Sequence, residues 1–359
     1  METTIHDSSQ SPSPENFSYP FVAFVVKKEM DKLPFPALKR QVCCRYEASS
    51  EVPLLDFLAK RFHYLTREAW AEQIQTGNLC INQHPAQADQ MLQPGALLEF
   101  IPRELPEPPV SWDIQIIFED EQVLILNKPG NLPCHPSGTF FNHTLWAWLK
   151  QYQKLPEVHF CNRLDRETSG LVIVGKSSEA AQRLNRVLQQ PDACKEYLVL
   201  VQGKFPDSLH CNGWLLPDAN SPVRKKRAFV ENLTIEIPQA ESACTEYTRL
   251  AYHPLTNFSL LKAILKNGRT HQIRATLCSL GFPVIGDKLY GVDDRLFLKL
   301  ASDSLSPEDH ARLLLPRQAL HAWKITFRLP AQSNPVQFTA PLPQDMRNLL
   351  EQLNIQIPI

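Results

Sequence analysis

The sequence lacks an apolar run long enough to cross a membrane, since a spanning helix needs about 20 such residues. Residues 1–17, METTIHDSSQSPSPENF, also lack the apolar core of a secretory signal peptide and the arginine-rich face of a transit peptide. Both absences argue against a membrane or organelle address. We therefore expect a cytoplasmic protein without a membrane partner.

Motifs for disulfides, metals and nucleotide cofactors are missing as well. The nine cysteines are scattered and form no CxxC pair, which argues against a zinc site or a disulfide framework and favours a reducing compartment. The chain contains no GxGxxG motif, no P-loop and no cluster with metal-ligand spacing. We expect a protein that needs no cofactor and no metal.

Excess charge of one sign is also absent, because 37 Lys and Arg stand against 38 Asp and Glu. A bulk positive field that attracts nucleic acid is thereby excluded, and any contact with nucleic acid must come from local basic patches. At 359 residues the chain is long enough for two domains.

A Pro-rich stretch, PRELPEPPV at residues 102–110, is a stiff linker and indicates the domain boundary. The region up to about Glu15 has the composition of a disordered segment, and FVAFVVKK at 21–28 reads as a strand. We divide the chain into a partly disordered N-terminal extension (1–50), a small domain (51–103), the linker (104–111), a large domain (112–345) and a tail (346–359).

The small domain is expected to hold two helices followed by two strands. Leu54, Leu58 and Phe62 form the apolar face of the first helix, and Thr66 is a plausible N-cap for a second helix that ends at Gly77. LCIN and LLEF then read as short strands.

The large domain has more strands than helices. The clearest helix is SSEAAQRLNRVLQQ at 177–190, with serine caps and one apolar face. Strands and helices do not alternate regularly, which favours an α+β fold with a mixed, mainly antiparallel sheet. The expected strands lie near 114–120, 123–129, 171–176, 197–203, 258–265 and 322–329.

The segment CNRLDRETSGLVIV, residues 161–174, places two acids and two arginines directly before four aliphatic residues. Asp165 in its turn is either a cap or exposed charge, which turn chemistry favours, or a functional carboxylate. Tyr197 begins an apolar strand, where it either fills the core or offers a nucleobase a stacking surface.

A third segment, residues 265–291, predicts a turn at Asn267-Gly268 and then a helix capped by Thr270 and ended by Gly281. Arg274 lies near the start of this helix, where a positive charge opposes the helix dipole. We therefore expect an anionic partner for Arg274.

Five segments in the same order resemble the motifs of the RluA family of RNA pseudouridine synthases. The resemblance covers residues 112–343. Asn162 and Phe282 stand where the family usually has histidine. The segments are LNKPGNLPCHP (126–136), NRLDRETSGLVIV (162–174), KEYLVLVQG (195–203), GRTHQIRATLCSLGFPVIGDKLYG (268–291) and RQALHAWKITF (317–327).

The resemblance implies an isomerase that converts uridines of ribosomal or transfer RNA to pseudouridine. It implies Asp165 as the essential catalytic aspartate, Tyr197 as the base-stacking tyrosine and Arg274 as the partner of that aspartate. We expect RNA as the partner of a monomeric protein. The further expected RNA contacts in the large domain are Arg163, Arg166, Lys195, Arg224, Lys225, Lys226, Arg227, Arg269 and His271.

The small domain resembles the αL-type RNA-binding domain shared by a ribosomal small-subunit protein, tyrosyl-tRNA synthetases and many pseudouridine synthases. Lys60, Arg61 and Arg67 are its expected phosphate contacts. The second helix also carries Glu68 and Glu72, so the alternative is a small packing domain without RNA contact.

Pseudouridine formation breaks the N-glycosidic bond, turns the uracil and rejoins it through carbon five, and it needs one ionised carboxylate beside a flipped nucleotide. Burial raises the pKa of an aspartate and a paired arginine reverses that effect. The carboxylate could add to the uracil ring, attack the sugar carbon or remove a sugar proton.

Two other functions remain open from the sequence. One is an RNA-binding or RNA-folding factor that has lost catalysis. The other is a hydrolytic glycosidase, which usually needs a second carboxylate, and Glu167 is the nearest candidate for that role.

Overall fold

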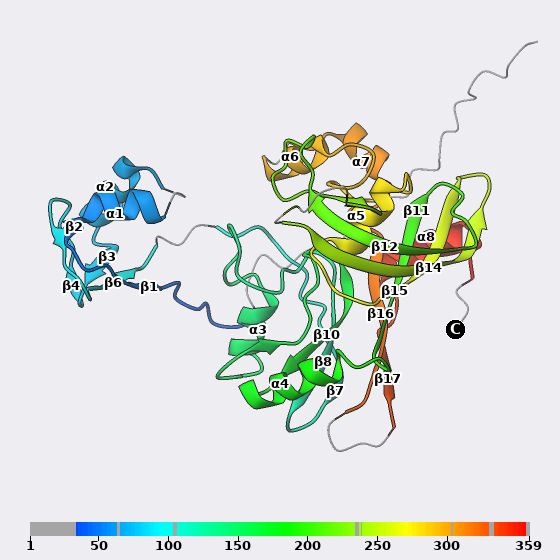
Figure 1. The fold of residues 1–359 in the computed structure, drawn as a ribbon, viewed down its shortest axis with the longest axis horizontal. Helices are drawn as coiled ribbons and strands as arrows, with labels where there is room; N and C mark the ends of the chain where they lie inside the picture. The colour runs from blue at the N-terminus through cyan, green and yellow to red at the C-terminus, as the bar shows by residue number, and fades with distance from the viewer. Residues whose placement is uncertain are drawn as a thin grey trace, which may run out of the picture.

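The computed structural model describes residues 34–62, 65–102, 106–233, 237, 239–302, 304–329 and 334–356. The segment expected to be disordered and the strand expected at 21–28 lie outside these ranges. Figure 1 shows a large sheet with helices around it and a separate small domain near the N-terminus.

The large sheet confirms the predicted α+β class with a mixed, mainly antiparallel sheet. Within the described residues its order is β13-β12-β14-β15-β11-β16-β10-β8-β7, with β17 beside β16 and β9 beside β10. Its one parallel pair among these strands is β10 with β16. The strands are β7 Gln115–Glu119, β8 Val123–Lys128, β9 His159–Phe160, β10 Ser169–Gly175, β11 Cys194–Gln202, β12 Ser208–Pro217, β13 Arg227–Val230, β14 Glu241–His253, β15 Phe258–Leu265, β16 Leu320–Phe327 and β17 Val336–Thr339.

The aliphatic run after Asp165 forms β10, whose two faces are both buried. Val172 and Val174 belong to the core that includes α3 (Leu145–Gln151). Leu171 and Ile173 point the other way, into the core that includes residues of α4 (Ser178–Val187). Because successive strand side chains alternate in direction, a strand covered on both faces needs a continuous apolar sequence.

The remaining helices of the large domain are α5 Gln272–Ser279, α6 Arg295–Ala301, α7 Pro307–Leu313 and α8 Gln344–Gln352. The Ser177 side chain caps α4 by accepting from the Ala180 N–H, as the sequence predicts. The prediction that Thr270 caps α5 is wrong. The N-cap is His271, in the left-handed region at φ 59°, and its side chain makes no capping hydrogen bond.

The small domain contains a sheet of order β1-β6-β3-β4, a two-stranded sheet β2-β5, and two helices. Thr66 caps α2 through the Ala69 N–H, as expected. β1 lies before the range 51–103 and pairs with β6. The elements are β1 Val42–Arg45, β2 Val52–Pro53, α1 Leu54–Arg61, α2 Arg67–Gln75, β3 Leu79–Ile81, β4 His84–Pro85, β5 Met91–Leu92 and β6 Leu97–Phe100.

Both chain segments that lead into the small domain are fixed on one loop of the large domain. Residues 34–40, here called the strap, reach it through Leu38, whose N–H donates to Asn142 Oδ1 at 2.7 Å. The Glu107 carboxylate accepts from the backbone N–H groups of residues 141–143 at 2.7 to 2.8 Å. The strap also buries Phe35 edge-on against Trp112. The described end of the Pro-rich linker is therefore held in place and is not a free spacer.

Candidate active site

Asp165 lies in the turn between β9 and β10, and a buried lysine stabilises this turn by donating hydrogen bonds to backbone carbonyl groups. Lys128 is fully buried, and its Nζ donates to Leu132 O at 2.9 Å and to Arg166 O at 3.2 Å. The turn closes with the Thr168 N–H donating to Asp165 O at 3.1 Å. The backbone from Asp165 to Thr168 is thereby fixed.

The Asp165 carboxylate meets the expected arginine, and the arginine has a second acidic partner. Arg274 Nη1 donates to Asp165 Oδ2 at 2.7 Å. On its other edge Nε donates to Asp287 Oδ2 at 2.6 Å and Nη2 to Asp287 Oδ1 at 2.9 Å. The Arg274 side chain is 8% exposed, that of Asp287 is fully buried, and that of Asp165 is 29% exposed. Asp165 is thus the acid of this group that solvent or a substrate can reach.

The charges of this group set its ionisation. Burial acts to raise the pKa of Asp165, but the charge and hydrogen bond of Arg274 outweigh it and leave that pKa below its ordinary value. Burial acts to lower the pKa of Arg274, and the charges of Asp287 and Asp165 reverse this and raise it. At neutral pH the site therefore contains an ionised Asp165 carboxylate in contact with a protonated guanidinium.

Asp287 was not among the residues predicted from the sequence, although a signal for it was present. No acid occurs between Leu265 and Gly286, so Asp287 is the first acid after Arg274 along this segment. Gly286 before it has φ 75°, and a Cβ there would lie 2.1 Å from the Arg317 carbonyl oxygen. Asp287 also accepts from the Leu289 and Tyr290 N–H groups, both at 2.9 Å, which fixes its orientation.

Tyr197 reaches the same region from β11. A register shift between Glu196 and Tyr197 pairs Tyr197 with Ala322 of β16, and Ala322 pairs on its other side with Gly170 of β10. Gly170 has φ 114°, and a Cβ there would lie 2.2 Å from the Ala322 oxygen, so the strands require glycine. The turn of Asp165 and Tyr197 are thereby brought to the same end of neighbouring strands.

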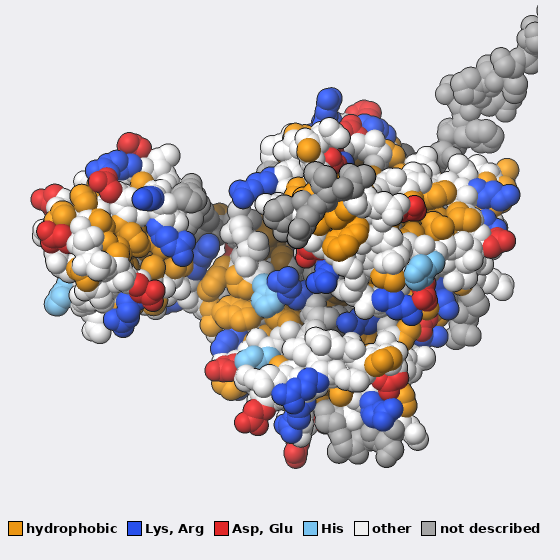
Figure 2. Space-filling model, in the orientation of Figure 1, with side chains coloured by type: hydrophobic (Ala, Val, Ile, Leu, Met, Phe, Trp, Pro, Cys, Tyr) orange, Lys and Arg blue, Asp and Glu red, His pale blue; other side chains and the backbone are white. Residues whose placement is uncertain are grey.

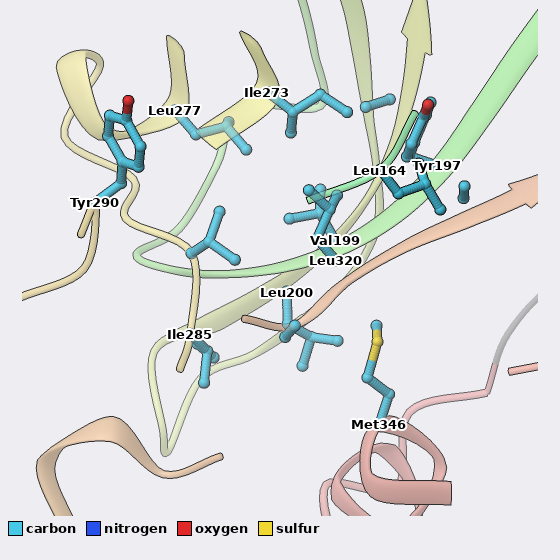
Figure 3. Packing of buried hydrophobic residues seen from close by; sticks show 14 of the residues in the cluster. Leu164, Tyr197, Val199, Leu200, Ile273, Leu277, Ile285, Tyr290, Leu320 and Met346 are labelled. Atoms are coloured by element: carbon cyan, nitrogen blue, oxygen red, sulfur yellow. The ribbon is translucent and has the colours of Figure 1, made fainter. Parts of the chain in front are cut away.

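The Tyr197 ring is buried, with 9% exposure. Figure 3 shows it beside Leu164, the residue before Asp165, with its hydroxyl directed away from the labelled core residues Val199 and Leu320. Burial, with the nearby Asp165 charge, raises the pKa of Tyr197, so its hydroxyl stays protonated.

His271 and Glu167 lie near Asp165 and differ in what they can contribute. His271 Nε2 lies 3.8 Å from Asp165 Oδ1, and its Nδ1 lies 2.9 Å from the Tyr290 hydroxyl. Burial lowers the pKa of His271 to about 4, so the ring is neutral at pH 7. Glu167 contacts Lys288 Nζ at 2.8 Å and is 13% exposed, so an ion pair already occupies it.

In the basic run 224–227, Lys226 and Arg227 lie near acidic side chains, whereas Arg224 and Lys225 do not form ion pairs among the described residues. Lys226 Nζ pairs with Asp294 at 3.0 Å and with Asp218 at 3.6 Å. Arg227 lies 3.9 Å from Glu241, whereas Arg224 is exposed. Lys225 covers the Phe297 ring at 4.0 Å.

Lys225 is the member of this run with the clearest link to the site. Lys225 is exposed at the surface, and its partial burial, with the charges of Arg274 and Arg166, lowers its pKa, while the charge of Asp165 acts to raise it. This lysine therefore lies within electrostatic range of the carboxylate.

The other predicted RNA contacts of the large domain occupy varied environments. Arg163 is exposed, and Arg166 covers the Phe140 ring at 5.4 Å. Arg269 is exposed and donates from Nε to Ser242 O at 3.1 Å. Burial lowers the pKa of Lys195 on β11. Their contacts with RNA stay predictions.

In the small domain, Lys60 is exposed and Arg67 forms an ion pair with Asp56. Arg61 lies 5.5 Å from the Phe62 ring centre and lines a surface hollow of about 440 Å³. Arg45 of β1 lines the same hollow and was not predicted. This hollow brings two of the domain's arginines together.

The described part of the chain places no three His, Cys, Asp or Glu residues where they could share a metal ion. None of its helices has the length and apolar character needed to span a membrane. The chemistry available at Asp165 is that of a positioned, ionised carboxylate with a protonated phenol beside it.

Comparison with known proteins connects this site to a family. The sequence pattern of the family described as RNA pseudouridylate synthase matches residues 122–279, which include Asp165, Tyr197 and Arg274. The chain is 34% identical over 242 residues to ribosomal large subunit pseudouridine synthase D of Nitrosomonas europaea, covering 66% of this chain and 64% of that protein.

Two further similar proteins are also named as pseudouridine synthases. The chain is 31% identical over 264 residues to ribosomal large subunit pseudouridine synthase D of Zymomonas mobilis, covering 71% of this chain and 77% of that protein. It is 29% identical to the mitochondrial tRNA pseudouridine(32) synthase of Saccharomyces cerevisiae, and that match spans 51% of the yeast protein. Among solved structures, human RNA pseudouridylate synthase domain containing 4 has the same fold, with a TM-score of 0.51, 23% identity, and coverage of 68% of this chain and 94% of the human one.

Proposed function

Because the chain belongs to the RNA pseudouridylate synthase family, of the RluA type, we propose that it isomerises uridines in ribosomal or transfer RNA to pseudouridine, with Asp165 as the essential catalytic group. The observation that carries this proposal is the contact between the Asp165 carboxylate and Arg274, whose other edge is bound by the buried Asp287. This arrangement supplies the ionised, oriented carboxylate that the reaction needs.

The reaction conserves atoms and electrons. The bond between N1 and C1′ breaks, the freed uracil turns in the site, and C5 bonds to C1′. C5 loses its proton and N1 gains one, so no oxidant or reductant takes part. Whether Asp165 adds to the ring, attacks C1′ or removes a sugar proton, only its ionised form can act, and the lowered pKa of Asp165 keeps it in that form at neutral pH.

The target uridine has to leave its helix to reach Asp165. In this proposal the uracil then stacks against Tyr197, whose protonated hydroxyl adds no negative charge beside the carboxylate. His271 is neutral at pH 7, so the positive charge in contact with Asp165 is that of Arg274. The hydrolytic alternative is not favoured, because Glu167 is occupied by Lys288.

One incubation separates this function from its alternatives. Transcripts of ribosomal and transfer RNA labelled with tritium at uridine C5 are incubated with the purified protein, and tritium in water and free uracil are both measured. Isomerisation releases tritium without free uracil. Free uracil would identify a hydrolase, and binding without release of either product would identify an RNA-binding factor.

The names of the relatives refer to both ribosomal and transfer RNA, so the substrate of this chain has to be mapped. Carbodiimide-based mapping of pseudouridines in cells with and without the gene identifies it. We expect positions that disappear on deletion and return when the wild-type gene, but not Asp165→Asn, is supplied.

Tyr197 provides a prediction about stacking. We expect Tyr197→Ala to lower kcat/KM more than Tyr197→Phe, because base stacking on an aromatic ring contributes roughly 1–3 kcal/mol and Phe keeps the ring. Tyr197→Leu controls for lost core volume, since the ring is buried. Equal losses in the Phe and Ala variants, each measured below its unfolding temperature, would assign the effect to the hydroxyl alone.

The small domain provides a prediction about RNA affinity. Replacing residues 42–102 by a Gly-Ser linker retains the strap, Phe35 and Glu107, which all contact the large domain. We expect a folded protein that binds the substrate RNA more weakly by roughly 100-fold, because two linked binding modules raise affinity by that order. Arg45→Gln with Arg61→Gln in the full chain is the matched test of the hollow. Unchanged affinity in both proteins would show that this domain does not bind RNA.

A further inference from the structure

A row of aromatic rings, each beside a cation, begins next to Asp165. The guanidinium of Arg166, the residue after Asp165, lies 5.4 Å from the Phe140 ring centre. Phe141 follows, and its ring centre lies 5.8 Å from that of Trp146 on α3. Trp146 in turn has Lys150 Nζ 6.0 Å from its ring centre. We call Phe140, Phe141 and Trp146 the aromatic stripe.

The stripe ends at the segment that leads to the small domain. Arg40, at the end of the strap, lies 5.8 Å from the Phe141 ring centre. The Phe141 N–H donates to the carboxylate of Glu107. Glu107 belongs to the Pro-rich linker, the second chain segment that leads to the small domain. The stripe therefore extends from the turn of Asp165 to the loop at which both the strap and the Pro-rich linker contact the large domain.

Core packing accounts for only part of the stripe. All three rings are half-buried. Phe140 and Trp146 each pack one side on the large core, whereas Phe141 is not among the described residues that pack against it. Figure 2 shows hydrophobic side chains on the large domain facing the small domain, with Lys, Arg and His side chains at their edge.

We propose that the aromatic stripe binds unpaired nucleotides that flank the target uridine, with their bases stacked on its rings and their phosphates beside Arg166, Arg40 and Lys150. This inference rests on the proposed function, because it extends the path of the substrate RNA from Asp165 toward the small domain. It adds a binding surface in a segment that contributes no residue to the Asp165, Arg274 and Asp287 group.

Charge and geometry favour single-stranded RNA as the occupant. Surfaces that bind single strands combine aromatic rings with cations along the backbone path, because every base has a face that can stack. Each ring of the stripe has its own cation. Both nearby acids already have partners. Glu107 accepts from the backbone N–H groups of residues 141–143, and Glu167, 3.4 Å from Arg166 Nη2, is also paired with Lys288 at 2.8 Å.

Phe141 is the residue with which to test the stripe, since its loss leaves the core intact. In an Asp165→Asn background, which prevents turnover, affinity is measured by fluorescence anisotropy with labelled oligouridine of about 12 nucleotides, within the range of known single-strand sites. We expect Phe141→Ala to weaken binding by roughly 5- to 150-fold, the range for loss of one base stack. Phe141→Leu keeps apolar bulk without an aromatic face and should bind nearly as weakly.

Tyr152 offers a matched control on the same helical segment. Tyr152 is 59% exposed, and its ring stacks on that of Trp148. Trp148 is two positions after Trp146, so the two tryptophans lie on different sides of α3. We expect Tyr152→Ala to bind oligouridine as the parent does. Equal weakening by Tyr152→Ala and Phe141→Ala would overturn the assignment to the stripe.

A second measurement does not depend on how the Phe141 and Tyr152 variants fold. Oligouridine containing 4-thiouridine is photo-crosslinked to the protein that carries Asp165→Asn alone, and the linked peptides are identified by mass spectrometry. We expect crosslinks in residues 138–150. Crosslinks confined to other segments, or a Phe141→Ala variant that keeps its RNA affinity but changes self-association in sedimentation, would overturn the proposal.

The two proposals can fail separately. If the wild-type protein releases tritium from labelled RNA but Phe141→Ala binds oligouridine normally, the stripe is wrong and the proposed function stands. If Phe141→Ala weakens binding and crosslinks map to 138–150 while no pseudouridine forms, the stripe binds RNA and the catalytic assignment is wrong.

Discussion

The Asp165→Asn variant is expected to form no detectable pseudouridine while it remains folded and binds RNA as the wild type does. Asparagine keeps the size of the side chain and can still contact Arg274, but it supplies neither a nucleophile nor a base. Loss of one essential catalytic side chain commonly lowers activity by a factor of about 1,000 or more. The measurement is the pseudouridine content of nuclease-digested RNA after incubation with each protein.

The neighbouring acid provides the control for Asp165→Asn. Glu167→Gln removes a carboxylate from the same turn that pairs with Lys288. We expect it to lower thermal stability while it keeps activity within about tenfold of wild type, since Glu167 takes no chemical role in the account. Residual activity of Asp165→Asn above a few per cent, or a loss in Glu167→Gln as deep as that of Asp165→Asn, would contradict the assignment.

Arg274→Ala is expected to be nearly inactive at neutral pH and to recover part of its activity as pH rises. Removal of the guanidinium leaves Asp165 and the fully buried Asp287 without their shared cation. Breaking a buried pair in this way typically costs about 3–5 kcal/mol of stability. The pKa of Asp165, no longer held down by the guanidinium, rises with burial, and a protonated carboxyl cannot act.

The direction of the pH effect follows from the lowered pKa of Asp165 in the wild type. A depressed folded-state pKa contributes stability above the unfolded value, about 3.9, and that contribution is lost as pH falls through the lower folded value. In Arg274→Ala the order is reversed, so the ionised form and the activity increase toward alkaline pH. A pH–rate profile parallel to that of wild type would show that Arg274 does not maintain the charge of Asp165.

Conservative variants separate charge from fold. Arg274→Lys should be more active than Arg274→Ala but less active than wild type, because a point charge cannot contact both carboxylates with the planar geometry of a guanidinium. Asp287→Asn keeps the shape of the buried partner and should loosen Arg274 without removing its charge. Circular dichroism and thermal unfolding confirm that each variant is compared in its folded state.

Much of this arrangement follows from local sequence. The apolar period predicted α4 and its Ser177 cap, and the aliphatic run after Asp165 predicted a buried strand. The position of Arg274 near a helix start predicted an anionic partner, and the structure has two, Asp165 and Asp287. These features were accessible because each depends on residues close together in the chain.

Features that depend on distant segments were not predicted. His271 takes a left-handed conformation in contact with Tyr290, which displaces the expected cap at Thr270. β1 joins the small sheet across more than 50 residues, and Glu107 contacts a loop 34 residues away. These contacts join residues that are far apart in the sequence. Helix and strand propensities and local residue spacing therefore do not predict them.

The ionisation of Asp165 in the free protein tests the central claim most directly. Protein labelled with carbon-13 at the aspartate carboxyl is titrated by NMR, and the Asp165 resonance is assigned by its absence in Asp165→Asn. We expect this carboxyl to titrate with a midpoint below the ordinary value of about 3.9, and we expect the midpoint to move upward in Arg274→Ala. A wild-type carboxyl that titrates above that value, or a midpoint unchanged in Arg274→Ala, would contradict it.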